Sequence, residues 1–273
     1  MFANRLMTPF ALIAALFLGL AWAVDDKYSI YFVPFLVISA LIFILSPQIN
    51  WWWYSRNPPD LSAELRVFLE RHHGYYRRLS GADQRRFRGR VAMFNMGTDW
   101  EPLSFPEDSL PPDVQVAISA QAVALTLNRA QFLFDQFEKV IVFPRPFPTP
   151  EHPYDHASEM HEGDGCLLFS AEQVMFAFVK PMQWYNVAMH EYAKAFVLKY
   201  PEEAWPSFSA EDVWDKLEVA SKMPRAHVES VIGLAGVDAL PVAIHHFFIF
   251  PERFASVFPE ESQVLAKRFG IVS

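Results

Sequence analysis

The sequence has little of several features that would point to common functions. Its 273 residues include one cysteine, Cys166, so neither an intrachain disulfide nor a cysteine-based zinc site can form. It has no excess of positive charge either, because 31 Asp and Glu residues outnumber 23 Lys and Arg residues and give a net charge of -8 at pH 7. General nucleic-acid binding needs a basic surface, so we expect no nucleic-acid partner. A glycine-rich phosphate loop and a nucleophile elbow are also absent from the sequence.

Charge is missing from two long runs near the N-terminus. Met7–Val24 and Tyr28–Leu45 are each 18 residues long and uncharged, and a short charged linker, residues 25–27, separates them. As a helix, each run would span about 27 Å, which is close to the thickness of a bilayer's hydrocarbon core. We therefore predict a transmembrane hairpin, with the membrane as one partner of the protein. Trp51–Trp53 would then lie in an aromatic belt at the membrane interface.

Arginine residues flank these runs on their outer sides. Arg5 precedes the first run, and several arginines, Arg56 and Arg66 among them, follow the second. The positive-inside rule then places both ends of the hairpin in the cytoplasm. We predict an inner (cytoplasmic) membrane protein whose soluble domain faces the cytoplasm. Two alternatives stay open: "AWA" at Ala21–Ala23 is typical of a signal-peptidase site, or the two runs are core helices, although neither has a polar face.

Composition and spacing divide the chain into a transmembrane hairpin with a membrane-interface segment (1–54), a polar, proline-containing linker (55–60) and a soluble domain (61–273). In the soluble domain, apolar residues at helical spacing and capping residues predict several helices. They begin near Leu61, Ser80, Pro111, Gln183 and Ser209, the last with Asp212 as a second capping residue. Two apolar runs, Lys139–Pro144 and Gly165–Ser170, predict strands. The expected fold class is α+β, dominated by helices and with a small sheet.

The stretch "HEYAK", His190–Lys194, lies inside one of these helices. Positions i and i+4 share one face of a helix, so histidines at both can hold one Zn²⁺ while a glutamate at i+1 acts as general base on the metal-bound water. His190 and Glu191 fit this plan. Lys194 does not, because an ammonium group has no lone pair to offer a metal.

The order of the surrounding motifs resembles the Mlc titration factor (MtfA) family of zinc-dependent peptidases. The resemblance is carried by "LSGADQRRFRGRVAMF", "VAISAQAVALTL", "FEKVIVFPRPF" and "VAMHEYAKAF", and more weakly by "ALPVAIHHFFIFPERF". It covers roughly Leu79–Phe269, and it implies a helix-rich zincin domain preceded here by an additional transmembrane hairpin. Members of that family have a second zinc-binding histidine at the position of Lys194. Aligning "FFIFPE" backward places the family's third ligand near Asp238, a shorter carboxylate.

These departures lead to different hypotheses about function. The first is a membrane-anchored pseudoenzyme that binds no cofactor and acts as a cytoplasmic binding or regulatory module, with a peptide or protein partner in the former active-site groove. The alternative is an active zinc-dependent metallopeptidase with rearranged ligands, in which His190 and either Asp238 or His245 hold the metal and Glu191 is the general base. A structural membrane protein without a groove function is a third possibility.

Lys194 itself allows two interpretations. Its ammonium can replace the charge of the zinc ion and pair with Glu191 or Asp238, because an unpaired buried carboxylate is costly. Alternatively, Lys194 extends to solvent. The histidines of "EHPYDHASEMH" (151–161) also have two interpretations, an exposed loop cluster, which we expect, or an improvised metal site.

Overall fold

The computed structural model describes residues 2–107, 109–208 and 212–271, which form two compact units, Met1–Pro59 and Asp60–Ser273. The N-terminal unit is a helical hairpin followed by a short third helix. Helix α1 (Phe2–Ala23) and helix α2 (Ser29–Ile44) are joined by a 3-10 turn, η1 (Asp26–Tyr28), and helix α3 is Ser46–Arg56. Helix α3 packs on the start of α1, where the Ala3 backbone N–H donates to Asn50 Oδ1 over 2.8 Å and the Phe2 and Trp53 rings stack at 4.0 Å.

Two segments of this unit, Phe2–Ala23 and Asp26–Ile44, are long and apolar enough to cross a membrane. Only 6% of each apolar window is buried, whereas a core helix of a soluble protein would be buried on most sides. The interpretation as two core helices is therefore wrong. Helix α3 was not expected: it takes up the tryptophan run and ends at Arg56, so the first two residues of the expected linker are helical.

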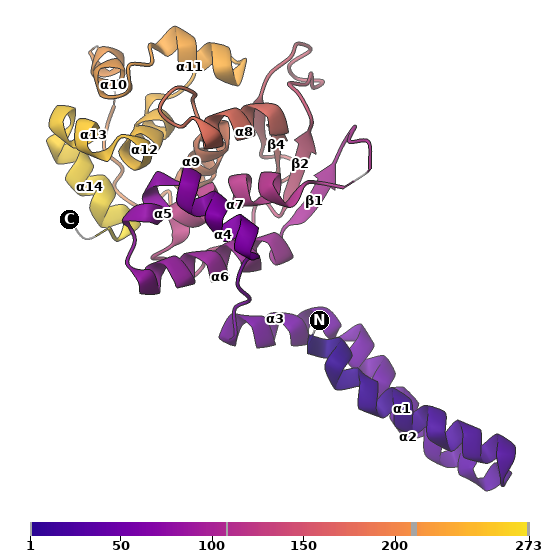
Figure 1. Ribbon diagram of the computed structural model, residues 1–273. Helices are drawn as coiled ribbons and strands as arrows, with labels where there is room; N and C mark the ends of the chain where they lie inside the picture. The colour runs from indigo at the N-terminus through magenta and orange to yellow at the C-terminus, as the bar shows by residue number, and fades with distance from the viewer. Residues whose placement is uncertain (1, 108, 209–211, 272–273) are drawn as a thin grey trace. The chain divides into compact units, whose positions relative to one another are not determined.

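The second unit is built around a four-stranded sheet with the order β1-β2-β4-β3 (Figure 1). Strands β1 (Asp99–Pro102), β2 (Lys139–Phe143) and β4 (Cys166–Ser170) run parallel, and β3 (Ser158–His161) pairs antiparallel with β4 at one edge. Both expected strands are present within one residue of their predicted ends. Strands β1 and β3 were not predicted, because they are short and carry polar residues and so show no apolar pattern.

Helices make up most of the unit and gather on one side of this sheet (Figure 1). In chain order they are α4 (Ala63–His72), α5 (Gly74–Arg78), α6 (Gly81–Gly97), α7 (Pro112–Thr126), α8 (Ala171–Val179), α9 (Val187–Lys199), α10 (Val213–Ser221), α11 (Arg225–Ile232), α12 (Ala239–Ile249), α13 (Pro251–Val257) and α14 (Pro259–Phe269). The predicted α+β class, helix-rich with a small sheet, is confirmed. The expected helix start at Ser209 lies outside the described residues, and α10 begins at Val213.

Alternation along the strands gives the sheet two different faces. Val140, Val142, Leu167 and Phe169 point into the main core, in which α7 and α9 are buried on nearly all sides. The opposite residues form a smaller apolar cluster beneath the loop that follows β2. The edge strand takes part in both faces, because Ser158 and Met160 face α9 while Glu159 and His161 face the loop. Cys166 is a buried residue of the smaller cluster.

The loop between β2 and β3 is closed by a bridge between Phe147 and His156 and rests against the end of α11. The Ala157 N–H donates to the carbonyl of Ile232, and Gly233 follows with a positive φ of +87°. A Cβ atom at Gly233 would lie 2.6 Å from the Cα atom of His156. A glycine is therefore required for close backbone approach as well as for conformation.

We expect Gly233→Ala to destabilise the protein more than Gly236→Ala. Gly236 also has a positive φ, +77°, but an added Cβ there meets nothing within 4 Å. Backbone strain alone should cost about 1 kcal/mol in Gly236→Ala, and the clash with His156 should add at least about 1 kcal/mol in Gly233→Ala. Chemical denaturation of both variants measures the difference. Equal losses would show that the loop moves away without cost.

Candidate functional site

Helix α9 holds the HEYAK stretch at the centre of the unit. It begins at the cap residue Asn186, whose side chain accepts a hydrogen bond from the Met189 N–H over 2.9 Å. The helix packs against α7, α8, α12 and the strands β3 and β4. Consequently His190 and Glu191 are buried, with 4% and 1% of their surface exposed, while Lys194 is only half-buried.

Both oxygens of the Glu191 carboxylate are engaged. Lys194 Nζ lies 2.8 Å from Glu191 Oε2 and forms an ion pair with it. Ser158 Oγ, at the start of β3, donates a hydrogen bond to Glu191 Oε1 over 2.8 Å. The carboxylate therefore joins the helix to the edge of the sheet.

The surroundings of Glu191 favour its charged form. Burial raises the pKa of Glu191, but the Lys194 ammonium and the hydrogen bonds from Lys194 and Ser158 outweigh burial and hold this pKa below its ordinary value. The carboxylate is thus ionised at neutral pH in a site where an unpaired charge would be costly.

His190 is held by Tyr185, which precedes the helix cap Asn186. Its Nδ1 atom lies 2.7 Å from the hydroxyl of Tyr185, which is completely buried. Burial lowers the pKa of His190 to about 4, so the imidazole is neutral at physiological pH. A neutral histidine fixed through one ring nitrogen is the form that binds metals.

His245 lies close to this group but has a different role. Its Nε2 atom accepts a hydrogen bond from the backbone N–H of Asn186 over 3.1 Å, and its Nδ1 atom lies 3.0 Å from Nδ1 of His246. Both ring nitrogens therefore face other groups of the protein. Burial holds the pKa of His245 well below its ordinary value, so this residue serves as a neutral acceptor at the start of α9.

Asp238 precedes α12 and lines a cavity of about 550 Å³ together with Lys194. The cavity lies beside the end of β3, and its wall is mainly apolar: Met160, Val197, Leu198, Pro206, Phe208, Ala239, Leu240 and Pro241. Among the described residues, Lys194 forms its ion pair with Glu191 and makes none with Asp238. The exposed Asp238 carboxylate raises the pKa of His190 slightly against the stronger effect of burial, so the two side chains interact across the site.

The residues on α9 do not fit a zinc ion. Zinc in peptidases takes three nitrogen or oxygen ligands from the protein, and here the place of one of them is held by an ammonium group already bonded to Glu191. Within the part of the chain that the structure describes, His190, Asp238 and His245 are not gathered at ligand distance. Three other residues, Glu151, His152 and Glu159, do bring one possible ligand atom each close together, on the other face of the sheet.

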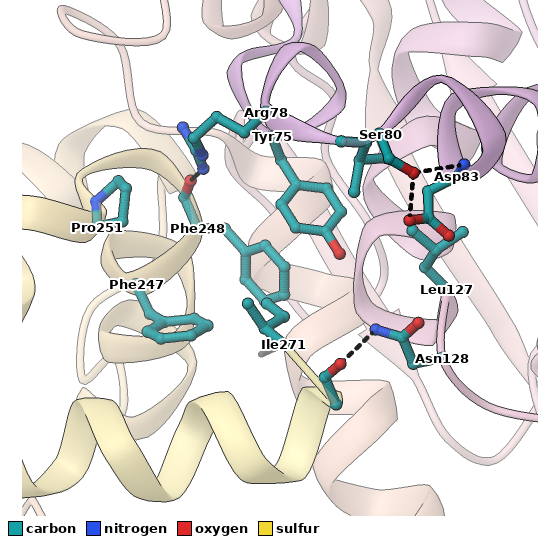
Figure 2. Close-up of a pocket in the computed structure, with 12 residues that line it drawn as sticks. Tyr75, Arg78, Ser80, Asp83, Leu127, Asn128, Phe247, Phe248, Pro251 and Ile271 are labelled. Atoms are coloured by element: carbon teal, nitrogen blue, oxygen red, sulfur yellow. Dashed lines mark hydrogen bonds between the residues drawn. The ribbon is translucent and has the colours of Figure 1, made fainter. Parts of the chain in front are cut away.

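A second cavity, of about 460 Å³, lies between α5, the end of α7 and α12 (Figure 2). The aromatic rings of Tyr75, Phe247 and Phe248 form its apolar wall. Its polar groups are bonded to each other: Ser80 Oγ donates to Asp83 Oδ2 over 2.7 Å, and Asn128 Nδ2 donates to the Gly270 carbonyl over 2.9 Å. None of the site residues expected from the sequence lies in this cavity.

Comparison with known families identifies the class of the protein. The fold is a helix-rich, zincin-like domain, and residues 49–196 match the model of the glucose-regulated metallo-peptidase M90 family. This match covers more than half of the chain, so the chain belongs to that family. It includes HEYAK but ends before Asp238 and His245. A search of curated proteins found no match.

Two residues of the site were not expected from the sequence. Ser158 lies 33 positions before its partner Glu191, and Tyr185 lies next to a helix cap. Neither stands in a motif that sequence spacing reveals. The pairing of Lys194 with Glu191 was one of two interpretations of the sequence, and it follows from their positions three residues apart on the helix.

We expect Lys194→Met to destabilise the protein by about 3 kcal/mol, because it leaves the buried Glu191 carboxylate without its cation. The double change Lys194→Met with Glu191→Gln should recover about half of that loss, since the stranded charge is then gone. Urea unfolding of the single and double variants measures this coupling.

Lys216→Met is the matched control. Lys216 pairs with Asp212 on an exposed helix surface, and its removal should cost less than about 0.5 kcal/mol. Small and additive effects at Lys194 and Glu191 would mean that solvent, and not the ion pair, stabilises the carboxylate.

Proposed function

We propose that this member of the M90 family is a pseudoenzyme that binds an extended peptide segment of a partner protein. One observation carries the proposal: the Lys194 ammonium lies 2.8 Å from the carboxylate that would have to act as general base. A base must be free to take a proton from water, but Glu191 Oε2 is held by Lys194 and Oε1 by Ser158. Lys194 would thus supply the positive charge of the absent metal without its Lewis acidity.

The cavity beside Lys194 supports the binding part of the proposal. Strand β3 is at the edge of the sheet, and an extended peptide can add to such an edge through main-chain hydrogen bonds. The cavity adjoins the end of this strand and offers half-buried apolar side chains, such as Val197 and Leu240, for a peptide's side chains. Its charged groups, Lys194, Glu162 and Asp238, lie around this apolar surface and would select among peptides.

A fluorescently labelled pool of casein peptides tests binding and cleavage together. We expect saturable binding to the full-length protein, seen as fluorescence anisotropy, and no cleavage with added zinc. Leu198→Asp should weaken binding at least tenfold, about 1.4 kcal/mol, because it places a charge in the apolar wall of the cavity. Val219→Asp is the control, since Val219 is also an exposed apolar residue, lies on α10 and does not line this cavity.

Two results would contradict the proposal. Absence of saturable binding would remove the peptide-binding role. The alternative of an active metallopeptidase would be supported by zinc-dependent cleavage that disappears in Glu191→Gln. It would also require bound zinc that is lost in His190→Ala. That alternative is favoured by family membership and by His190, which is neutral and held through Nδ1 as a zinc ligand would be.

We also propose that the N-terminal hairpin anchors the protein in the inner membrane with the peptidase-like unit in the cytoplasm. The two apolar segments and the arginines beside them support this orientation. A reporter that functions only in the cytoplasm should be active when it is fused after Ser273. A fused reporter that is active only in the periplasm should be silent, and activity of that reporter would reverse the proposed orientation.

A further inference from the structure

The face of the sheet opposite α9 carries a second group of metal-binding side chains. Glu159 of β3 points to this face, and the loop after β2 brings Glu151 and His152 next to it. One ligand atom from each of the three residues lies within 4.8 Å of the other two. The loop is held in place by the bridge between Phe147 and His156.

Glu159 is a buried carboxylate with a free oxygen. Its side chain is 6% exposed, and its Oε2 atom lies 3.1 Å from Nε2 of His156. Among the residues that the structure describes, no donor reaches Glu159 Oε1, and no lysine or arginine forms an ion pair with the carboxylate. His156 therefore holds one oxygen of the Glu159 carboxylate and leaves the other oxygen available as a ligand.

The two loop residues complete a set of ligands. The His152 ring is half-buried against Tyr154 and His156, and neither of its nitrogens has a hydrogen-bond partner among the described residues. The Glu151 side chain is 64% exposed and lies 3.3 Å from Nε2 of His161. One imidazole and two carboxylates are thus available, while two further histidines contact the carboxylates.

We propose that Glu151, His152 and Glu159 bind a divalent transition metal of the zinc type. One nitrogen and two carboxylate oxygens suit such an ion, and a water molecule would take a fourth position. His156 and His161 would orient the carboxylates, as hydrogen-bonded neighbours of metal ligands commonly do.

Metal binding requires the group to close slightly. Ligand atoms about 2.05 Å from a tetrahedral zinc lie roughly 3.4 Å apart. The ligand atoms here lie within 4.8 Å of one another, so no separation has to shrink by more than about 1.4 Å. The exposed Glu151 side chain can make this movement without disturbing the core. The bound ion would fasten the loop to β3, the strand that also borders the cavity beside Lys194.

Titration of the full-length protein with Co²⁺, followed by visible absorption, tests this site. We expect one Co²⁺ per chain, displaced by Zn²⁺, and an affinity more than about 100-fold lower in Glu151→Gln and in His152→Ala. Both altered residues lie in the loop and are not part of the core, and circular dichroism checks that the variants fold. Zn²⁺ should also raise the unfolding temperature of the wild type but not of these variants.

Three controls make the result specific. Glu162→Gln removes an exposed carboxylate just beyond β3, and His227→Ala removes a half-buried histidine of α11; neither should change Co²⁺ binding. His190→Ala should also leave it unchanged, which separates this site from the one on α9. The inference is overturned if Glu151→Gln and His152→Ala bind Co²⁺ as the wild type does, if binding is lost in His190→Ala alone, or if the wild type binds no Co²⁺.

Discussion

The buried carboxylate of Glu191 is the constraint on which the centre of this molecule depends. Helix α9 is enclosed by other helices and by the sheet, so an ionised group on it needs partners at short distance. Lys194 and Ser158 supply them at 2.8 Å each. The first partner comes from the same helix and the second from the edge strand, so satisfying this one charge also fixes the helix against β3.

The same contacts limit what chemistry the site can perform. A metallopeptidase needs a cation with open coordination positions and a carboxylate free to accept a proton. Here the cation is an ammonium group without coordination positions, and both oxygens of the carboxylate are occupied. His190 is neutral and held through Nδ1, which are features of a metal ligand. A lysine in place of a histidine at position 194 does not remove these features. Membership of a metallopeptidase family is therefore compatible with the ion pair between Lys194 and Glu191.

Features that depend on neighbouring residues could be predicted from the sequence. Ser80 caps a helix, the apolar residues after Pro111 form an all-round buried helix, and both apolar strands occur as expected. Contacts between distant residues were not predictable in this way. His245 looked available as a ligand, yet it accepts a hydrogen bond from Asn186, 59 residues earlier in the chain. The edge strand β3 was not predicted, because it has polar residues on both of its faces and therefore no alternation of apolar and polar residues.

The edge strand β3 separates the polar group around Glu191 from the polar group around Glu159. Successive side chains of a strand point to opposite faces, so Ser158 meets Glu191 while its neighbour Glu159 meets His156. Each carboxylate is buried on its own side of the sheet and has its own partners. The strand is only four residues long and pairs with one neighbour, so its position depends on what holds it from both faces. Any contact that holds the loop between β2 and β3 against Glu159 therefore also restricts the movement of β3, which borders the cavity beside Lys194.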